Sequence, residues 1–193
     1  MADRGVSHPE PDGALIQQSA HDRPDAFVDV VRRHEVAIHA YLARRADHQV
    51  ADDLLAEVWV RAFAARSGYD TRYGDARPWL YGIARNVLRE HWRTMSDDER
   101  AAITETWVDP WDGVNERLDS TKRATAIMSA VRSLPAAERE VMLLVAWEQL
   151  TPAEAARALG VPQGTARSRL HRARRALRQA LSERDGDQAG VST

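Results

Sequence analysis

The chain has 193 residues, with 27 Lys and Arg against 29 Asp and Glu, so its formal net charge is −2. This length fits one or two domains, and a hydrophobic content of 44% is enough to form a buried core. The absence of cysteine excludes disulfides, thiol catalysis and cysteine-ligated zinc. The longest apolar run, Val141 to Trp147, is far shorter than the ~20 residues of a membrane helix, and no signal peptide is visible. We therefore expect a cytoplasmic protein without direct membrane insertion.

The chain divides into five segments. Residues 1–24 are polar and contain three prolines without an apolar period, which predicts a mobile tail. Residues 25–95 and 122–182 show helical periodicity, residues 96–121 are acidic and irregular, and residues 183–193 form a second polar tail. No alternating strand pattern occurs. The sequence therefore predicts an all-α fold of two small helical domains joined by a flexible acidic linker.

The small net charge is the sum of opposed blocks. Residues 160–181 contain six arginines and no acid, whereas residues 96–121 contain eight acids against two arginines. Residues 72–94 hold five arginines, two acids and four Trp or Tyr residues. Charge counted by segment is therefore the better guide to partners, although a solvated helix face is the alternative for each block.

Three helices are expected in the first domain. The first, about residues 25–45, places on one face Phe27, Val30, Val31, His34, Ile38, Tyr41 and Leu42. The second, about residues 49–65, buries Val50, Leu54, Leu55, Val58, Ala62 and Phe63. Its other face shows Asp52, Asp53, Glu57 and Arg61.

The third helix, about residues 75–93, has an apolar side that comprises Leu80, Ile83, Ala84, Val87, Leu88 and His91. The opposite side carries Gly82, Arg85, Asn86, Arg89 and Arg93, with Trp79 and Trp92 on the two flanks. Arginines beside aromatic rings are what a binder of single-stranded nucleic acid needs. Solvated arginines beside core tryptophans explain the same pattern, so the residues alone leave both readings open.

The most specific local signal begins at Thr151. Thr151, Pro152 and Glu154 fit a capping box with proline at the first helical position. Gly160 then provides the left-handed residue that ends a short helix, and a second helix starts after Pro162. Two helices across such a turn form a helix-turn-helix.

The second helix of this pair has two opposite faces. On a wheel of about 100° per residue, its apolar side comprises Ala166, Leu170, Ala173 and Leu177. The other side carries Gly164, Arg167, Ser168, His171, Arg172 and Arg175. An arginine-rich front without any acid suits the major groove of DNA, and glycine permits close approach to a phosphate backbone. A solvated terminal helix is the alternative.

Together these motifs resemble the extracytoplasmic-function (ECF) group of the sigma-70 family, the sigma factors of bacterial RNA polymerase. Residues 53–62 (DLLAEVWVRA) resemble the helix that binds core polymerase, and residues 79–93 (WLYGIARNVLREHWR) the helix that melts the promoter. Leu134-Pro135 with Glu138-Arg139 resembles the entry to the second domain, and residues 160–174 resemble the recognition helix. Ala56, Trp59, Glu90 and Ala166 depart from the residues usual in the family.

The resemblance implies a transcription initiation factor without catalytic residues, metal, cofactor or small-molecule substrate. Its implied polymerase-binding residues are Asp52, Asp53, Leu54, Glu57, Val58 and Arg61. The implied minus-ten set is Trp79, Arg85, Asn86, Arg89, Trp92 and Arg93. The implied minus-thirty-five set is Gln163, Gly164, Thr165, Arg167, Ser168, Arg169, His171, Arg172 and Arg175, of which Arg167, Ser168, His171 and Arg172 are the candidates for base contacts.

Core RNA polymerase and promoter DNA are the implied partners, and an anti-sigma protein commonly holds factors of this group. Two rival interpretations stay open. A stand-alone helix-turn-helix repressor would bind duplex DNA without polymerase. An enzyme would need Asp52 and Asp53 as paired carboxylates, but adjacent helix positions point about 100° apart, which argues against a shared site.

Overall fold

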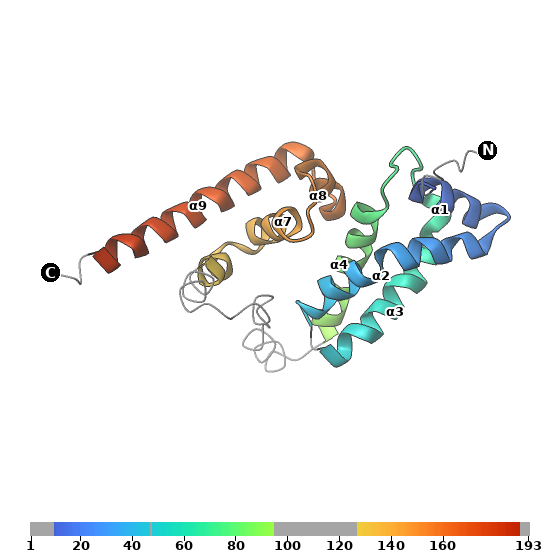
Figure 1. The fold of residues 1–193 in the computed structure, drawn as a ribbon, viewed down its shortest axis with the longest axis horizontal. Helices are drawn as coiled ribbons and strands as arrows, with labels where there is room; N and C mark the ends of the chain where they lie inside the picture. The colour runs from blue at the N-terminus through green and yellow to red at the C-terminus, as the bar shows by residue number, and fades with distance from the viewer. Residues whose placement is uncertain (1–9, 47, 95–126, 190–193) are drawn as a thin grey trace, which may run out of the picture. The chain divides into compact units, whose positions relative to one another are not determined.

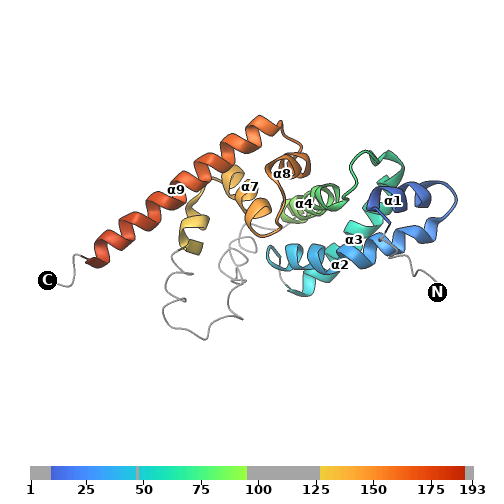
Figure 2. The same ribbon diagram turned by 45° about the horizontal axis from the view of Figure 1, so that its top comes forward.

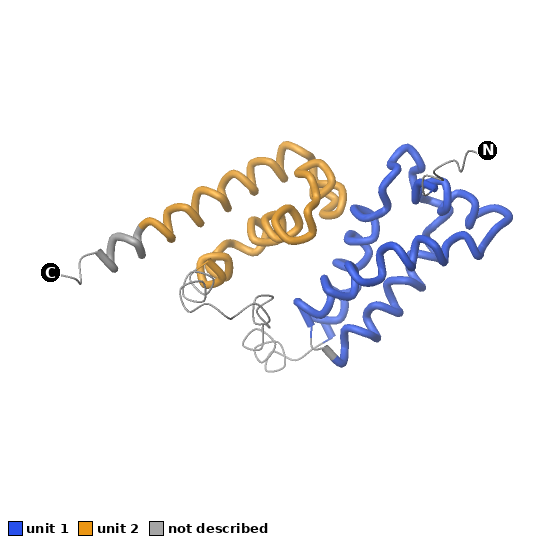
Figure 3. The backbone as a smooth tube through the Cα atoms, viewed as in Figure 1, with its two compact units in different colours: residues 1–94 blue, residues 95–193 orange. Residues whose placement is uncertain are grey.

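The structure is a computed structural model that describes residues 10–46, 48–94 and 127–189, with side chains for all of these except residue 48 and residues 183–189. The described residues form helices and turns, with no strand among them. They belong to two compact units, Met1–Thr94 and Met95–Thr193 (Figure 3). The predicted all-α fold class is confirmed. The predicted linker at 96–121 lies outside the described residues.

Unit 1 is built from the helices α1 (Asp12–His21), α2 (Phe27–Ala43), α3 (His48–Ala65) and α4 (Arg77–Thr94). Short 3-10 turns at Pro24–Ala26 and Arg66–Gly68 join α1 to α2 and end α3. α2 and α3 lie side by side, and α4 contacts both (Figure 1, Figure 2). The three helices expected in this region are therefore present.

One core joins the helices of unit 1. Its largest fully buried side chains are Ile16, Val30, Ile38, Leu42, Val58, Leu80 and Leu88. The rings of Tyr41 on α2 and Tyr81 on α4 pack edge to face with their centroids 5.2 Å apart. Six of the seven residues expected on the inner face of α2 are buried, the exception being the half-buried Val31. The apolar period therefore identified this face correctly.

The expected tail at residues 1–24 is wrong over α1. Leu15 and Ile16 are 3% and 0% exposed, so this helix belongs to the core. A Cβ atom at Gly13 would come within 3.1 Å of the Thr71 carbonyl oxygen, so glycine lets α1 lie close to the loop before α4. Gly13 and Thr71 are far apart in the sequence, so a local apolar period cannot predict that α1 packs here.

Phe63 is the second correction. The apolar period predicts Phe63 on the buried face of α3, but the residue is 38% exposed. Its ring packs edge to face on Phe27, with the centroids 5.5 Å apart. The guanidinium carbon of Arg66 lies 3.7 Å from the Phe63 ring centroid. Phe63 therefore lies at the margin of the core, with one part of its ring open to solvent.

Unit 2 contains a helical stretch at 127–133 followed by α7 (Ala136–Ala146), α8 (Pro152–Leu159) and α9 (Gln163–Ala189). The predicted capping box is present: the Thr151 amide donates to Glu154 Oε2 at 2.7 Å, and the Glu154 amide donates to Thr151 Oγ1 at 3.3 Å. Gly160 adopts φ 64°, the left-handed conformation that ends α8. Both ends of α8 are thus fixed by local sequence.

α9 lies on the rest of unit 2 with the predicted apolar face. Ala166 and Ala173 are fully buried, and Leu170 and Leu177 are 3% and 8% exposed. Ala173 and Leu177 join a cluster with residues of the preceding helices, namely Ala130, Val131, Leu134 and Leu143. The helix continues to Ala189, so residues 183–189 of the expected polar tail are helical instead.

Candidate nucleic-acid and protein interfaces

α9 presents most of its predicted DNA-binding residues to solvent. Seven of the nine are exposed: Gln163, Gly164, Arg167, Ser168, His171, Arg172 and Arg175. Thr165 and Arg169 are half-buried at the edges of this face. A Cβ atom at Gly164 would meet nothing within 4 Å, so no contact inside the described chain requires glycine there. The structure therefore brings these residues together on one cationic surface, which we call the α9 front.

Arg172 differs from its neighbours on the α9 front because a carboxylate holds it. Its Nε–H group donates to Glu138 Oε1 on α7 at 2.6 Å. The Arg172 side chain is 56% exposed and that of Glu138 only 15%. No local sequence pattern indicates this pair, because its members are 34 positions apart.

A groove runs beside the α9 front. Its apolar lining comprises Met142, Pro152, Leu170, Leu177 and Leu181, and its basic lining comprises Arg167, His171, Arg174 and Arg178. Two of the predicted base-contact residues, Arg167 and His171, therefore also border this groove.

α4 presents a smaller cationic face in unit 1. Asn86, Arg89 and Arg93 are exposed, whereas Trp79, Arg85 and Trp92 are half-buried. The Trp79 ring packs edge to face on Tyr69, with the centroids 5.1 Å apart. The opposite side of α4 is buried as predicted through Leu80, Ala84, Val87 and Leu88, while Ile83 and His91 are half-buried.

α3 separates its predicted polymerase-binding residues into two groups. Asp52 and Asp53 are exposed and Glu57 and Arg61 half-buried, but Leu54 and Val58 are 8% and 0% exposed. Leu54 and Val58 therefore belong to the core of unit 1, and the other four predicted residues are the ones that reach solvent.

Arg61 ties this surface to α4. Its Nε–H group donates to Glu57 at 2.6 Å, and its Nη1–H group donates to Glu90 on α4 at 2.7 Å. The hydrogen bond to Glu57, followed by that to Glu90, raises the pKa of Arg61. The same contact with Arg61 lowers the pKa of Glu90. At one end of this face, Asp52 lies 3.0 Å from His39 Nε2.

An apolar part of the same α3 surface was missed. Val60 is 64% exposed and Phe63 38% exposed, and Ala56 is exposed as well. These positions follow one another at spacings of four and three, which places them on one face of a helix. We call Ala56, Val60 and Phe63, with the polar residues Asp52, Asp53, Glu57 and Arg61, the α3 face. A helical wheel could have predicted this apolar surface, because it places Val60 among the polar residues of α3.

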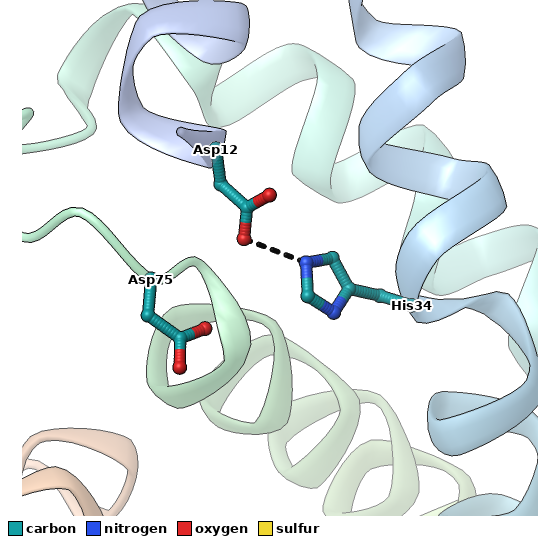
Figure 4. Close-up of side chains that lie close together, drawn as sticks. All are labelled: Asp12, His34 and Asp75. Atoms are coloured by element: carbon teal, nitrogen blue, oxygen red, sulfur yellow. Dashed lines mark hydrogen bonds and ion pairs between the residues drawn. The ribbon is translucent and has the colours of Figure 1, made fainter. Parts of the chain in front are cut away.

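One buried polar cluster lies in unit 1 (Figure 4). Asp12 Oδ2 accepts hydrogen bonds from His34 Nε2 at 2.7 Å and the Ala76 amide at 3.0 Å, and Asp12 Oδ1 accepts from Arg33 at 2.9 Å. Burial raises the pKa of Asp12, but the hydrogen bonds from His34 and Ala76 outweigh it and lower that pKa to about 2.

Asp75 completes a group whose ligand atoms all lie within 4.8 Å of one another. Its carboxylate accepts from the Arg77 amide at 2.8 Å and from Arg77 Nε at 3.0 Å. Since N–H donors already occupy both carboxylates and Arg33 is a permanent cation beside Asp12, the cluster is a structural clasp rather than a metal site.

Comparison with known proteins agrees with this arrangement. The family model "Sigma-70 region 2" matches residues 30–96, and "Sigma-70, region 4" matches residues 124–177. An RNA polymerase sigma-E factor of Streptomyces avermitilis is 32% identical over 170 residues, which cover 87% of this chain and 92% of that protein. The ECF RNA polymerase sigma factor SigC of Mycobacterium tuberculosis is 30% identical over 85% of this chain and 88% of that protein.

A solved structure of CnrH in complex with the cytosolic domain of CnrY superposes with a TM-score of 0.62. It is 25% identical and covers 89% of this chain and 97% of that chain. The chain therefore belongs to the sigma-70 family of RNA polymerase sigma factors, in its ECF group, and its function is promoter-specific transcription initiation. Within the described residues, no helix is long and apolar enough to cross a membrane.

Proposed function

We propose that this chain binds core RNA polymerase through the α3 face and promoter DNA through α4 and the α9 front, and that it has no catalytic activity of its own. The observation that carries the proposal is the α9 front: its predicted base-contact residues are exposed opposite a buried apolar side. Its partners, the polymerase and the chromosome, lie in the cytoplasm, so the chain acts there.

The α9 front has the properties of a major-groove reader. A helix enters the major groove with side chains near its N-terminus on the base edges, and α9 begins at Gln163, close to these residues. Arginine reads guanine through two parallel N–H groups, and serine or histidine adds single hydrogen bonds. We assign Arg167, Ser168, His171 and Arg172 to bases of the minus-thirty-five element. Gln163, Thr165, Arg169 and Arg175, with the backbone at Gly164, then bind phosphates.

α4 suits the minus-ten element after its strands separate. Arg85, Asn86, Arg89 and Arg93 offer charge and hydrogen bonds to one strand. The half-buried rings of Trp79 and Trp92 leave part of each surface for unstacked bases. Because the fold already holds both rings in place, less entropy is lost when a base stacks on them.

The α3 face combines acids with exposed apolar side chains. Asp52, Asp53, Glu57 and Arg61 provide polar contacts, and Ala56, Val60 and Phe63 provide apolar area near them. An apolar centre with a polar rim is the usual composition of a protein interface. We assign this face to the clamp helices of the largest polymerase subunit.

Regulation by a second protein follows from the relatives. CnrH was solved in complex with the cytosolic domain of CnrY. We propose that an anti-sigma protein binds this chain in a comparable way and keeps it from the polymerase until a signal arrives.

Transcription of genomic DNA by a reconstituted enzyme tests the proposal. The full chain is added to core RNA polymerase, the 5′ ends of the run-off transcripts are mapped, and core enzyme alone is the control. We expect transcripts that start downstream of a shared pair of sequence elements and depend on the added chain. No chain-dependent transcript, together with tight binding of duplex DNA by the chain alone, would establish the rival repressor function instead.

A further inference from the structure

Arg172 is the one arginine of the described α9 side chains that forms an ion pair with another helix. Its Nε atom lies 2.6 Å from Glu138 Oε1, and no second bond joins these two side chains. Arg167, Arg174 and Arg175 have no such carboxylate among the described residues. One predicted base-contact residue is therefore oriented by the fold, whereas its neighbours extend into solvent.

The atom that Glu138 binds determines where the rest of the guanidinium points. The group is planar and carries five N–H donors, one on Nε and four on the two terminal nitrogens. A carboxylate on Nε leaves the terminal nitrogens available for another acceptor. Those nitrogens form the pair of parallel N–H donors that recognises N7 and O6 of guanine. The observed bond therefore leaves the base-reading end of Arg172 unused and restricts its rotation.

Glu138 is itself held firmly. It lies in the first turn of α7, where the positive end of the helix dipole favours a carboxylate. Its amide donates to the Pro135 carbonyl oxygen at 2.9 Å, and the preceding Leu134 is 5% exposed in the core of unit 2. Because Glu138 is only 15% exposed, it transmits the position of this core to Arg172.

We propose that Glu138 is a positioning residue for promoter recognition: it presents Arg172 so that the terminal nitrogens read one guanine of the minus-thirty-five element. The inference rests on the proposed function of the α9 front. It makes base discrimination at that one position depend on a side chain of another helix that does not itself contact a base.

Loss of the Glu138 charge should raise the affinity for DNA in general but lower the discrimination at one base pair, and these two effects can be measured separately. As a negative charge near DNA, Glu138 repels phosphates, so its loss raises affinity for every duplex. As a positioning residue, it favours one base pair, so its loss lowers discrimination there. Glu138→Gln keeps the size of the side chain and changes only charge and hydrogen-bond strength. Glu140→Gln removes the same charge two residues further along α7 and is the matched control.

The experiment uses holoenzyme made from the full chain and core RNA polymerase. The probe is a promoter fragment from the genomic run-off mapping with its minus-thirty-five element randomised, and bound DNA is sequenced. We expect Arg172→Ala to reduce the preference at one base pair about tenfold. Glu138→Gln should reduce the preference at the same base pair at least threefold and leave other positions unchanged. Glu140→Gln should leave the preference intact, and Glu138→Gln should have no further effect in the Arg172→Ala background.

Three results would overturn the inference, and they differ from one another. If Glu138→Gln keeps the preference that Arg172→Ala loses, Glu138 does not position Arg172. If Glu138→Gln weakens preference at many positions and lowers the melting temperature of the free chain, the pair only braces α7 against α9. If Arg172→Ala itself changes no preference while Arg167→Ala does, Arg172 is not a base reader. If neither Arg167→Ala nor Arg172→Ala changes the preference at any base pair, the proposed role of the α9 front itself is wrong.

Discussion

Asp12 joins three segments of unit 1 through one carboxylate. It binds His34 and Arg33 on α2 and the backbone amide of Ala76 just before α4. The carboxylate is 8% exposed, so these bonds replace most of its contact with water. Buried charges are stable in a fold only when they are paired in this way.

Substitution of Asp12 should therefore be costly. We expect Asp12→Asn to reduce the free energy of unfolding by about 3 kcal/mol, because it leaves Arg33 and His34 without their carboxylate. Urea unfolding followed by circular dichroism measures this loss. Asp29→Asn is the control, since Asp29 is 53% exposed and its contact with Arg32 is 3.4 Å long. Equal losses in the two variants would contradict the role assigned to Asp12.

Because the pKa of Asp12 is lowered in the folded chain, its contribution to the free energy of unfolding depends on pH. The pKa is lowered from 3.8 to about 2, so the folded chain favours the ionised carboxylate. This stabilisation, about 2 kcal/mol, is fully present above the unfolded pKa and is lost as pH falls from about 4 towards 2. The difference in unfolding free energy between the chain and Asp12→Asn should shrink over that range. A constant difference would show that ionisation of Asp12 contributes nothing.

At the scale of single elements, α8 is the clearest case of local control. Thr151 and Glu154 cap its first turn reciprocally, and Gly160 ends it at φ 64°. We expect Thr151→Ala to destabilise unit 2 by about 1 kcal/mol and Thr151→Ser to retain most of that stability. Amide hydrogen exchange in α8 is the measurement. Unchanged exchange in Thr151→Ala would mean that tertiary packing alone fixes this helix.

α3 allows a test of its apolar surface that is separate from stability. Val60 is 64% exposed, so Val60→Asp should leave the melting temperature nearly unchanged. It should weaken binding to core RNA polymerase at least tenfold, because it buries a charge without a partner in the interface. Val36→Asp on α2, at a residue that is 80% exposed, is the matched control. Equal weakening by both variants would exclude a specific role for the α3 face.

Comparison of these elements shows what the sequence can predict. The inner faces of α2, α4 and α9 follow from apolar spacing, and the ends of α8 follow from residues that act on their immediate neighbours. α1, the exposed ring of Phe63 and the Glu138–Arg172 pair all depend on contacts between distant residues. The apolar period also predicts that Leu54 and Val58 are buried, and they are, whereas their assignment to the polymerase contact rests on the family resemblance alone. Local rules thus predicted elements and their faces, whereas tertiary contacts decided which side chains remain free for a partner.

For the whole molecule, a net charge of −2 coexists with a strongly cationic α9. Each phosphate contact releases counterions, so promoter affinity should fall steeply with salt. We expect Arg175→Gln to reduce the slope of log affinity against log salt by ~1 on promoter and unrelated duplexes alike. Holoenzyme binding over a range of salt concentrations measures the slope, with Arg32→Gln on α2 as the control for loss of one charge. A slope unchanged by Arg175→Gln would remove that residue from the phosphate contacts.

The position of α1 affects how the first domain can be isolated. The family match begins at residue 30, and a shortened protein cut there would lack the helix that carries Asp12, Leu15 and Ile16. α2 would lose the packing of α1 against it, and the His34 ring would lose its carboxylate partner. Fragments intended for biophysical work on unit 1 should therefore begin before residue 10, and fragments trimmed to the match should aggregate or unfold at lower temperature.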